Sequence, residues 1–267
     1  MKYSISNLTW GSSALDEIIP RLATTGLQGV EIAPTAIWPD LSNVCDQEVT
    51  KFKEYLESHN LVVSGVQSLL YGRPELQLFD QRCWGDLRKH LENLIRIGGL
   101  LGAEVAVFGS PKNRVKGNLE LNYANELAAT FLSELEPTLK EHNIILTLEP
   151  NAPKYGADYL LTYEDVLKLC NKIDSTNIKP QIDTGCLWMV GEDPVNAFKS
   201  SRPHHIHLST RNLEPVPGTE NFENFLDCIL NNDYQNWLVI EFIGNSIQTT
   251  LDSLSWMFAT LNEERDG

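Results

Sequence analysis

Polar residues recur at the ends of four short apolar runs in the second half of this 267-residue chain. In order, the runs Leu146–Pro150, Pro180–Gly185, His205–Ser209 and Leu238–Phe242 contain Glu149, Asp183, His207 and Glu241. The steps between these four residues are 34 (149 to 183), 24 (183 to 207) and 34 (207 to 241). A (β/α)8 barrel of about 250 residues uses roughly 31 for each strand and its helix. The spacing therefore predicts one polar residue per unit, at the C-terminal mouth of a barrel.

The whole chain alternates between short β-like runs and longer helix-like segments. Strands are predicted at Tyr3–Ser6, Gly29–Ile32, Leu61–Gln67, Glu104–Phe108, Ile144–Leu148, Ile178–Ile182, His204–Leu208 and Trp237–Ile240. Helices are predicted near 13–24, 46–58, 83–100, 120–141, 163–172, 193–198, 222–231 and 247–262. This order indicates an α/β fold, a (β/α)8 TIM barrel in which residues 1–267 form a single domain. The alternative is an open doubly wound sheet, which usually has a Gly-rich loop after its first strand; this chain has none there.

The composition argues against some kinds of binding partner and some cellular locations. The chain has 36 acidic and 21 basic residues, a formal net charge of −15, which disfavours a nucleic-acid partner because polyanions require a basic face. No apolar run approaches the roughly 18 residues that span a bilayer, so we expect no membrane association. The N-terminus lacks a secretory pattern, and the five cysteines form no C-x-x-C pair. Both features predict a cytoplasmic protein with reduced thiols.

The four strand-end residues offer three carboxylates and one imidazole. Any one of them alone is more often a helix cap, an ion-pair partner or a structural histidine. Three carboxylates close together repel one another unless a cation lies between them. An oxygen-rich set with open positions suits Mn²⁺, Mg²⁺ or Co²⁺ better than Zn²⁺. The set therefore predicts a site for one divalent metal ion.

Two further phrases, Gly26–Pro34 and Val107–Pro111, complete a pattern that runs over nearly the whole chain. With the four strand-end phrases, it resembles the xylose-isomerase-like barrel superfamily. This is the sugar phosphate isomerase/epimerase group, which includes ketose 3-epimerases and an AP endonuclease branch. The resemblance implies that Glu149, Asp183, His207 and Glu241 bind one divalent metal. It also implies that Glu149 and Glu241 lie on opposite faces of a bound sugar and move protons.

One position departs from the family pattern. Members with epimerase activity often carry a histidine three residues after the aspartate, where this chain has Cys186. That histidine contacts substrate or a second metal, so its absence puts ketose 3-epimerase specificity in doubt. It also weakens the multi-zinc endonuclease interpretation. A buried thiol that packs as a small apolar group is the simpler expectation for Cys186.

Six other polar residues near the expected mouth are candidates for substrate binding. Cationic side chains there suit a phosphate or carboxylate group, and the others suit sugar hydroxyls. The cationic candidates are Lys112, Arg114, Lys154 and Arg211, and the others are Gln67 and Glu31. An ordinary solvated loop explains the charged ones equally well. Weaker candidates are His205, which shares the parity of His207, and an aromatic wall from Trp10, Trp38 or Trp188.

The function that these features predict is a metal-dependent sugar or sugar phosphate isomerase or epimerase. Glu149 or Glu241 would remove a proton beside a carbonyl, giving an enediolate that is reprotonated elsewhere. A hydrolase or a lyase (dehydratase) acting on a keto-sugar or inositol derivative is the alternative within enzymes. A barrel that only binds a ligand is the alternative outside them. The expected partner is a small carbohydrate, and assembly into a homo-oligomer stays open.

Overall fold

Eight parallel strands form a closed barrel in which each strand pairs with the next and β8 pairs with β1. The structure is a computed structural model that describes residues 1–11, 15–244 and 246–266. The strands are β1 (Lys2–Ser6), β2 (Gly29–Ile32), β3 (Val62–Val66), β4 (Val105–Phe108), β5 (Ile145–Leu148), β6 (Ile178–Asp183), β7 (His205–Leu208) and β8 (Trp237–Ile240). Every predicted strand is present, and no boundary differs by more than one residue. The predicted single-domain (β/α)8 barrel is confirmed.

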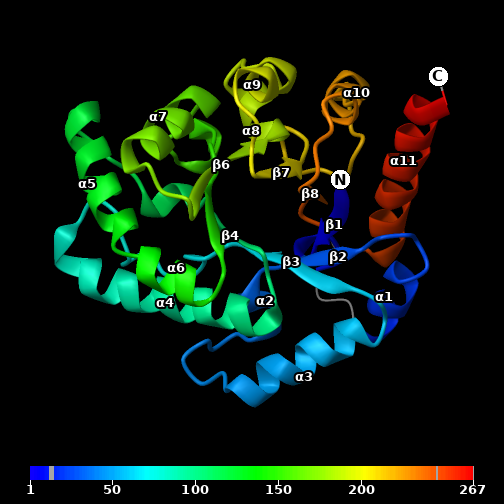
Figure 1. Ribbon diagram of the computed structural model, residues 1–267, viewed down its shortest axis with the longest axis horizontal. Coiled ribbons are helices and arrows are strands. Elements are labelled where there is room, and N and C mark those ends of the chain that lie inside the picture. The colour runs from blue at the N-terminus through cyan, green and yellow to red at the C-terminus, as the bar shows by residue number, and fades with distance from the viewer. Residues whose placement is uncertain (12–14, 245, 267) are drawn as a thin grey trace.

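Helices surround the strands, as Figure 1 shows. They are α1 (Leu15–Leu22), α2 (Pro34–Ile37), α3 (Asp46–Glu57), α4 (Trp84–Leu101), α5 (Leu121–Ser133), α6 (Glu136–Glu141), α7 (Tyr163–Ile173), α8 (Thr184–Met189), α9 (Pro194–Ser200), α10 (Glu223–Asn231) and α11 (Ile247–Asp266). Short 3-10 turns lie at η1 (Asn7–Thr9), η2 (Gln81–Cys83), η3 (Pro111–Asn113) and η4 (Pro153–Tyr155). The helix predicted from residue 13 begins at Leu15; residues 13 and 14 lie outside the described part of the chain.

The structure corrects one helix prediction and adds two short helices. The segment 120–141 forms α5 and α6 rather than one helix. Pro137 stands in the first turn of α6, where its missing N–H is tolerated; inside a continuous helix its ring would clash with the preceding turn. The helices α2 and α8 are too short to show a helical period in the sequence.

Polar side chains fill much of the barrel interior. Barrel interiors are usually packed with branched apolar residues, but here Ser4 and Ser64 share a buried hydrogen bond of 2.6 Å. Higher in the barrel, Thr147 donates a 2.6 Å hydrogen bond to Gln181. Each group has a partner, which offsets the free-energy cost of burying it. This paired interior lies directly below the candidate site.

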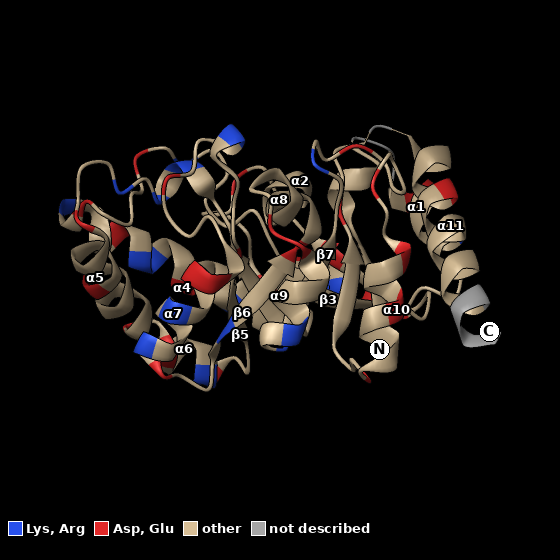
Figure 2. Ribbon diagram, turned by 90° about the horizontal axis from the view of Figure 1, so that it is seen from above, with Lys and Arg blue, Asp and Glu red and all other residues tan. Residues whose placement is uncertain are grey.

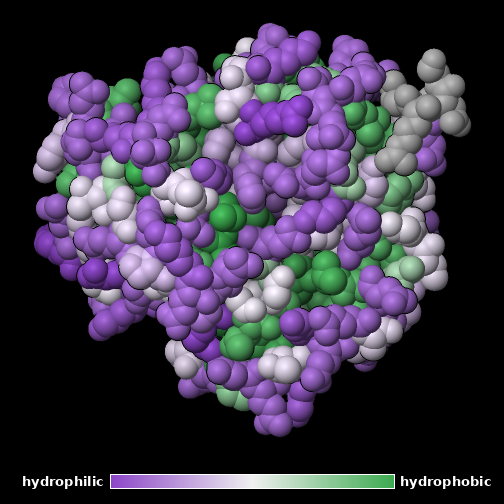
Figure 3. Space-filling view, viewed as in Figure 1, coloured by the Kyte–Doolittle hydropathy of each residue, from purple (hydrophilic) through white to green (hydrophobic). Residues whose placement is uncertain are grey.

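The apolar core lies mainly between the strands and the helices. In β7, Ile206 and Leu208 are fully buried and alternate with His205 and His207, because successive side chains of a strand point to opposite faces. The outer surface carries interspersed basic and acidic residues in Figure 2, and the face seen in Figure 3 is largely hydrophilic. Among the helices of the described residues, none combines the length and apolar composition that crossing a membrane requires.

Candidate metal centre

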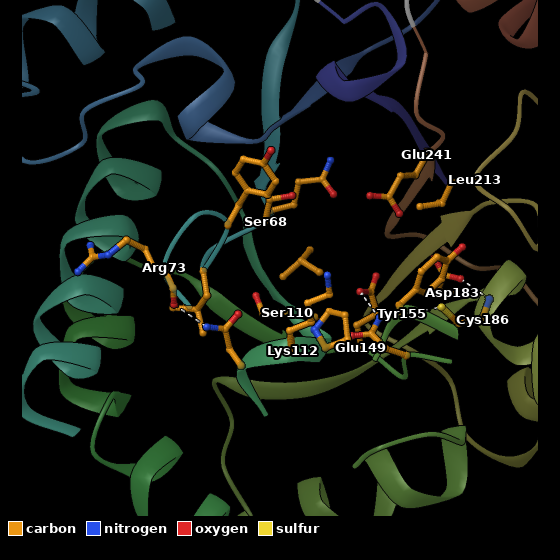
Figure 4. Close-up of a pocket in the computed structure, with 18 of the residues that line it drawn as sticks. Ser68, Arg73, Ser110, Lys112, Glu149, Tyr155, Asp183, Cys186, Leu213 and Glu241 are labelled. Atoms are coloured by element: carbon orange, nitrogen blue, oxygen red, sulfur yellow. Dashed lines mark hydrogen bonds between the residues drawn. The ribbon is translucent and has the colours of Figure 1, made fainter. Parts of the chain in front are cut away.

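Four consecutive strands bring the four predicted ligands together. Glu149 directly follows β5, Asp183 ends β6, His207 lies in β7 and Glu241 directly follows β8. One ligand atom from each lies within 4.8 Å of the others, and the four side chains are at most 13% exposed. Figure 4 shows the three carboxylates bordering one cavity. Residues that are 24 or 34 positions apart in the sequence therefore meet at one site.

The geometry around His207 fits a metal ion. Its Nδ1 atom lies 2.8 Å from Glu149 Oε1, 2.9 Å from Glu241 Oε2 and 3.9 Å from Asp183 Oδ2. This nitrogen is buried, yet it makes no hydrogen bond of acceptable geometry. Neighbouring ligands of an ion bound at about 2.1 Å are about 3 Å apart when they subtend a right angle. The separations suit ligands that share an ion, and the unpartnered nitrogen supplies one of them.

Hydrogen bonds orient two of the carboxylates. Glu149 accepts from Gln181 Nε2 at 2.8 Å and from Asn151 Nδ2 at 2.9 Å. Asp183 Oδ1 accepts from the Cys186 backbone N–H at 2.6 Å and from Ser209 Oγ at 2.9 Å. These bonds leave Asp183 Oδ2 as the oxygen nearer His207. An oriented ligand set of this kind is typical of protein metal sites.

Sequence reasoning did not single out Gln181 or Asn151 as part of the site. The available signal was the two-residue period of a strand, because Gln181 precedes Asp183 by two positions and so shares its inward face. Asn151 follows Glu149 by two positions in a loop, where that period no longer applies. Only the fold could reveal its contact with Glu149.

The electrostatics of the site call for a positive charge between the carboxylates. Burial raises the pKa of Asp183 well above its usual range, and the charges of Glu149 and Glu241 raise it further. Burial also raises the pKa of Glu241. For His207, burial lowers the pKa, but Glu241, Glu31 and Glu149 outweigh it and raise the pKa well above the usual range. A divalent cation would relieve the same repulsion.

A cavity of about 530 Å³ opens from the carboxylates (Figure 4). The loops after β3, β4 and β5 form much of its wall. Residues on the wall include Gln67, Ser68, Leu70, Tyr71, Arg73, Val107, Ser110, Lys112, Tyr155, Cys186 and Leu213. The volume suits a small molecule. Of the six predicted substrate contacts, Lys112 and Gln67 lie on this wall.

Comparison with known protein families matches residues 19–260 to the family described as xylose isomerase-like TIM barrel. The chain belongs to this family. None of the curated proteins compared with the chain matches its sequence. The resemblance seen in the sequence is thus confirmed at the level of the family.

Solved structures share the fold of this xylose isomerase-like barrel over nearly its full length. D-psicose 3-epimerase with D-fructose has a TM-score of 0.79 at 14% identity, covering 98% of this chain and 99% of that one. The probable 3-DHS dehydratase AsbF from Bacillus anthracis has a TM-score of 0.73 at 16% identity, covering 97% and 99%. The IolI protein with a bound zinc atom has a TM-score of 0.76 at 13% identity, covering 99% of each. At these identities the likeness concerns the fold, which serves different chemistries.

Two predicted substrate contacts of this family member have protein partners instead. Arg114 is fully buried, and its guanidinium donates to the backbone carbonyls of Phe108 and Glu149 and to the Asn151 side chain. Glu31 is also fully buried and contacts His205 and His207. Neither lies on the cavity wall. Their placement favours a role in holding the site over direct contact with substrate.

The other two cationic candidates lie off the cavity wall. Lys154 donates to the Asn212 side chain. Arg211 pairs with Glu220 at 3.4 Å and lies over the Trp188 ring. These contacts match the alternative that the sequence left open, an ordinary loop with surface charges.

The tryptophans have packing partners. Trp10 is 2% exposed in the core, Trp38 packs edge-on against Phe52, and Trp188 packs edge-on against Phe222. None of the three is on the cavity wall.

Cys186 lies on the cavity wall beside Asp183, as Figure 4 shows. Its side chain is 5% exposed, and burial raises the pKa of the thiol well above its usual range, with the charge of Asp183 adding to the effect. The thiol is therefore neutral at physiological pH. A neutral thiol is a weak hydrogen-bonding group and a poor metal ligand.

Proposed function

We propose that the protein is a divalent-metal-dependent isomerase or epimerase of a sugar or sugar phosphate. The observation that carries the proposal is the ligand set of Glu149, Asp183, His207 and Glu241, which borders a cavity large enough for a small molecule. Three carboxylates and one imidazole favour Mn²⁺, Mg²⁺ or Co²⁺ over Zn²⁺. When bound, the ion would polarise a substrate carbonyl and acidify the adjacent C–H bond.

The two glutamates would transfer the proton. Glu149 is held by Gln181 and Asn151, whereas Glu241 receives no hydrogen bond from a described residue apart from its contact with His207. Because the Glu241 carboxylate is less restrained than that of Glu149, we assign it the removal of the proton from carbon. Glu149 would return a proton on the opposite face. Return to the neighbouring carbon gives isomerisation, and return to the same carbon gives epimerisation.

Lys112 is the candidate for binding an anionic part of the substrate. It is exposed on the cavity wall, and no described carboxylate lies within ion-pair distance of it. An ammonium group without a protein counterion suits a phosphate or carboxylate. On this proposal, Lys112→Gln raises KM for a phosphorylated sugar at least several-fold more than KM for its unphosphorylated form. Equal effects on both forms would mean that Lys112 does not recognise the anion.

Elimination of water from a cyclic keto compound is the second candidate reaction. The neutral thiol of Cys186, together with Leu213, gives the cavity wall beside Asp183 and Glu241 little capacity to bind hydroxyl groups. A substrate with fewer hydroxyls than a free sugar suits such a wall. Removal of the same proton by Glu241, followed by cleavage of the β C–O bond, would give dehydration; the hydroxyl would leave as water after receiving a proton from Glu241 or Glu149.

Metal analysis and solvent exchange test the proposal. Purified protein should bind one Mn²⁺ or Co²⁺ per chain, measured by calorimetric titration and elemental analysis. The loaded enzyme, incubated with a panel of ketoses and ketose phosphates in D₂O, should introduce carbon-bound deuterium into at least one of them. Metal binding without exchange in any sugar, together with formation of an unsaturated ketone from a cyclic keto acid, would replace the isomerase with a dehydratase. Absence of metal binding would remove both.

A further inference from the structure

Glu31 is a buried carboxylate that the proposed proton transfer does not use. It lies on β2, and its side chain reaches β7 through the barrel interior. Its Oε1 atom is 2.7 Å from His207 Nε2, and its Oε2 atom is 2.6 Å from His205 Nε2. All three side chains are at most 1% exposed. One carboxylate thus joins two imidazoles directly below the metal centre.

The contacts specify which nitrogen of each ring carries a proton. An ionised carboxylate only accepts hydrogen bonds, so the Nε2 atoms of His205 and His207 must both donate. In a neutral His207 ring with the proton on Nε2, the lone pair is on Nδ1. That atom is the one next to Glu149 and Glu241, at 2.8 and 2.9 Å. The Glu31 contact therefore presents the ligand nitrogen to the metal centre.

The strands are shaped to admit this carboxylate. The pairing of β2 with β3 shifts by one residue at Glu31: Val30 pairs with Val63, but Glu31 pairs with Gly65, and Ser64 is left over. A bulge of this kind redirects nearby side chains. At Gly65, a Cβ atom would come within 2.9 Å of Glu31 Oε2 and 2.6 Å of Val105 Cγ2. The glycine and the bulge together make the space that Glu31 occupies.

We infer that Glu31 is a positioning residue that sets the tautomer and ring orientation of His207, while His205 holds its other oxygen. Its charge also makes the imidazole a better donor to a cation. Glu31 thereby sets the affinity of the centre for its ion. The inference rests on the proposed metal-dependent function, because it assigns to His207 the role of ligand.

A second metal site at Glu31, His205 and His207 is the competing explanation for the same cluster. The distances of 2.6 and 2.7 Å are those of charge-assisted hydrogen bonds, which already satisfy the carboxylate. The two explanations differ in stoichiometry. Positioning requires one ion per chain, whereas a second site would take up two.

The test compares Glu31→Gln with Glu192→Gln. Glutamine keeps the shape of Glu31 and removes its charge. The control makes the same substitution at a partly buried glutamate outside the centre, Glu192, which accepts the Tyr163 backbone N–H at 2.8 Å and does not touch His207. Calorimetric titration with Mn²⁺ should give one ion per wild-type chain. We expect Kd to rise about 10–100-fold in Glu31→Gln, the usual effect of losing such a partner, and less than about 3-fold in Glu192→Gln.

A spectroscopic measurement separates positioning from mere loss of stability. Long-range ¹H–¹⁵N spectra of ¹⁵N-histidine protein loaded with diamagnetic Zn²⁺ report the state of each ring nitrogen, and His207→Gln identifies the His207 signals by their loss. In the wild type, Nδ1 should carry the metal and Nε2 a strongly deshielded proton. The signal of that proton should shift upfield or disappear in Glu31→Gln and stay unchanged in Glu192→Gln.

A second pair of variants covers the case in which Glu31→Gln does not fold. His205→Gln keeps an N–H donor for Glu31, and His205→Met removes it. We expect a Kd near that of the wild type for the first and a rise of several-fold for the second, because Glu31 then loses one of its partners. Equal affinities would contradict the inference.

The outcomes distinguish this inference from the proposed function. Two bound ions, coordination through His207 Nε2, or an unchanged Kd in Glu31→Gln would each overturn the positioning role while leaving a metal-dependent enzyme intact. A weakened Kd in a protein that turns over no sugar would support the positioning role and overturn the proposed reaction. A wild type that binds no divalent ion would overturn both.

Discussion

At the scale of single residues, the two glutamates of the candidate metal centre have different surroundings. Glu149 accepts hydrogen bonds from Gln181 and Asn151. Burial tends to raise its pKa, but His207, Asn151 and Arg114 outweigh it and lower that pKa. For Glu241 burial prevails and the pKa is raised. Glu241, which lacks the hydrogen bonds that restrain Glu149, is the carboxylate that we assign to proton removal.

We therefore expect Glu241→Gln to lower kcat about 10²–10⁴-fold, the usual contribution of general acid–base catalysis. Glu149→Gln should also lower kcat if it returns the proton. Both variants are assayed at saturating Mn²⁺, because each loses one charge from the ligand set. Full activity of Glu149→Gln beside an inactive Glu241→Gln would indicate a one-base mechanism. Full activity of both variants would mean that another residue transfers the proton.

At the scale of elements, the pairing of β2 with β3 determines where Glu31 points. A regular ladder would place Ser64 opposite Glu31, whereas the bulge places Gly65 there. Burial of Glu31 is offset by its neighbours: burial raises its pKa, but the charges and hydrogen bonds of His207 and His205 lower it to about 2. The bulge thus makes room for Glu31, and the two histidines compensate the cost of burying its charge.

Gly65→Ala should disturb the packing around Glu31. Its Cβ atom would clash with Val105 and crowd Glu31, so we expect a loss of about 1–3 kcal/mol in the free energy of unfolding, typical of overpacking. Mn²⁺ affinity should fall as well. Gly85→Ala on α4 is the control, because nothing lies within 4 Å of its added Cβ. Its stability should change by less than about 1 kcal/mol. Urea unfolding measures the stability of both variants. Equal stabilities of Gly65→Ala and Gly85→Ala would show that the packing of β2 against β3 is not tight.

At the scale of the whole molecule, the candidate metal centre joins strands from one half of the barrel. The three carboxylates repel one another in the folded chain but not in the unfolded one, where they are separated and solvated. A cation that binds only the folded state stabilises the whole barrel by mass action.

At a Mn²⁺ concentration of 100 times Kd, the folded state should gain about 2.7 kcal/mol, which raises Tm by roughly 5–10 °C. Excess EDTA should reverse the rise. Asp183→Asn is the matched variant, because an amide oxygen can still accept the Cys186 N–H that begins α8 while the charge is lost. Scanning calorimetry measures the shift. The same rise in Asp183→Asn as in the wild type would place the ion elsewhere.

Acid should destabilise the barrel through His204. Burial, with a smaller effect of His205, lowers the pKa of His204 from 6.5 to about 4. The folded state therefore favours the neutral ring, so stability is complete above pH 6.5 and falls as the pH drops towards 4. His204→Gln should lose about 1 kcal/mol less than the wild type between pH 7 and pH 5, allowing for the partial exposure of the ring. Parallel urea titrations at both pH values test this; identical losses would contradict it.

The sequence by itself determined the barrel and the identity of the four candidate ligands. Both are local signals: a strand of four to six residues shows its apolar run, and a candidate ligand such as Asp183 lies at or just after the end of that run. The break between α5 and α6 was also encoded locally, by Pro137, although the amphipathic pattern across it predicted one helix.

Only the tertiary structure decided the contacts of the residues around those candidate ligands. Glu31 and His207 are 176 positions apart, and no local pattern reveals that β2 and β7 face each other through the barrel interior. Arg114 looked like a mouth cation from its place after β4, yet its side chain turns inward to Asn151. Lys112 and Arg114 are only two positions apart, yet Lys112 lies on the cavity wall and Arg114 is buried. The physical reason is that a side chain's direction within a loop depends on long-range hydrogen bonds, which form only when the barrel closes.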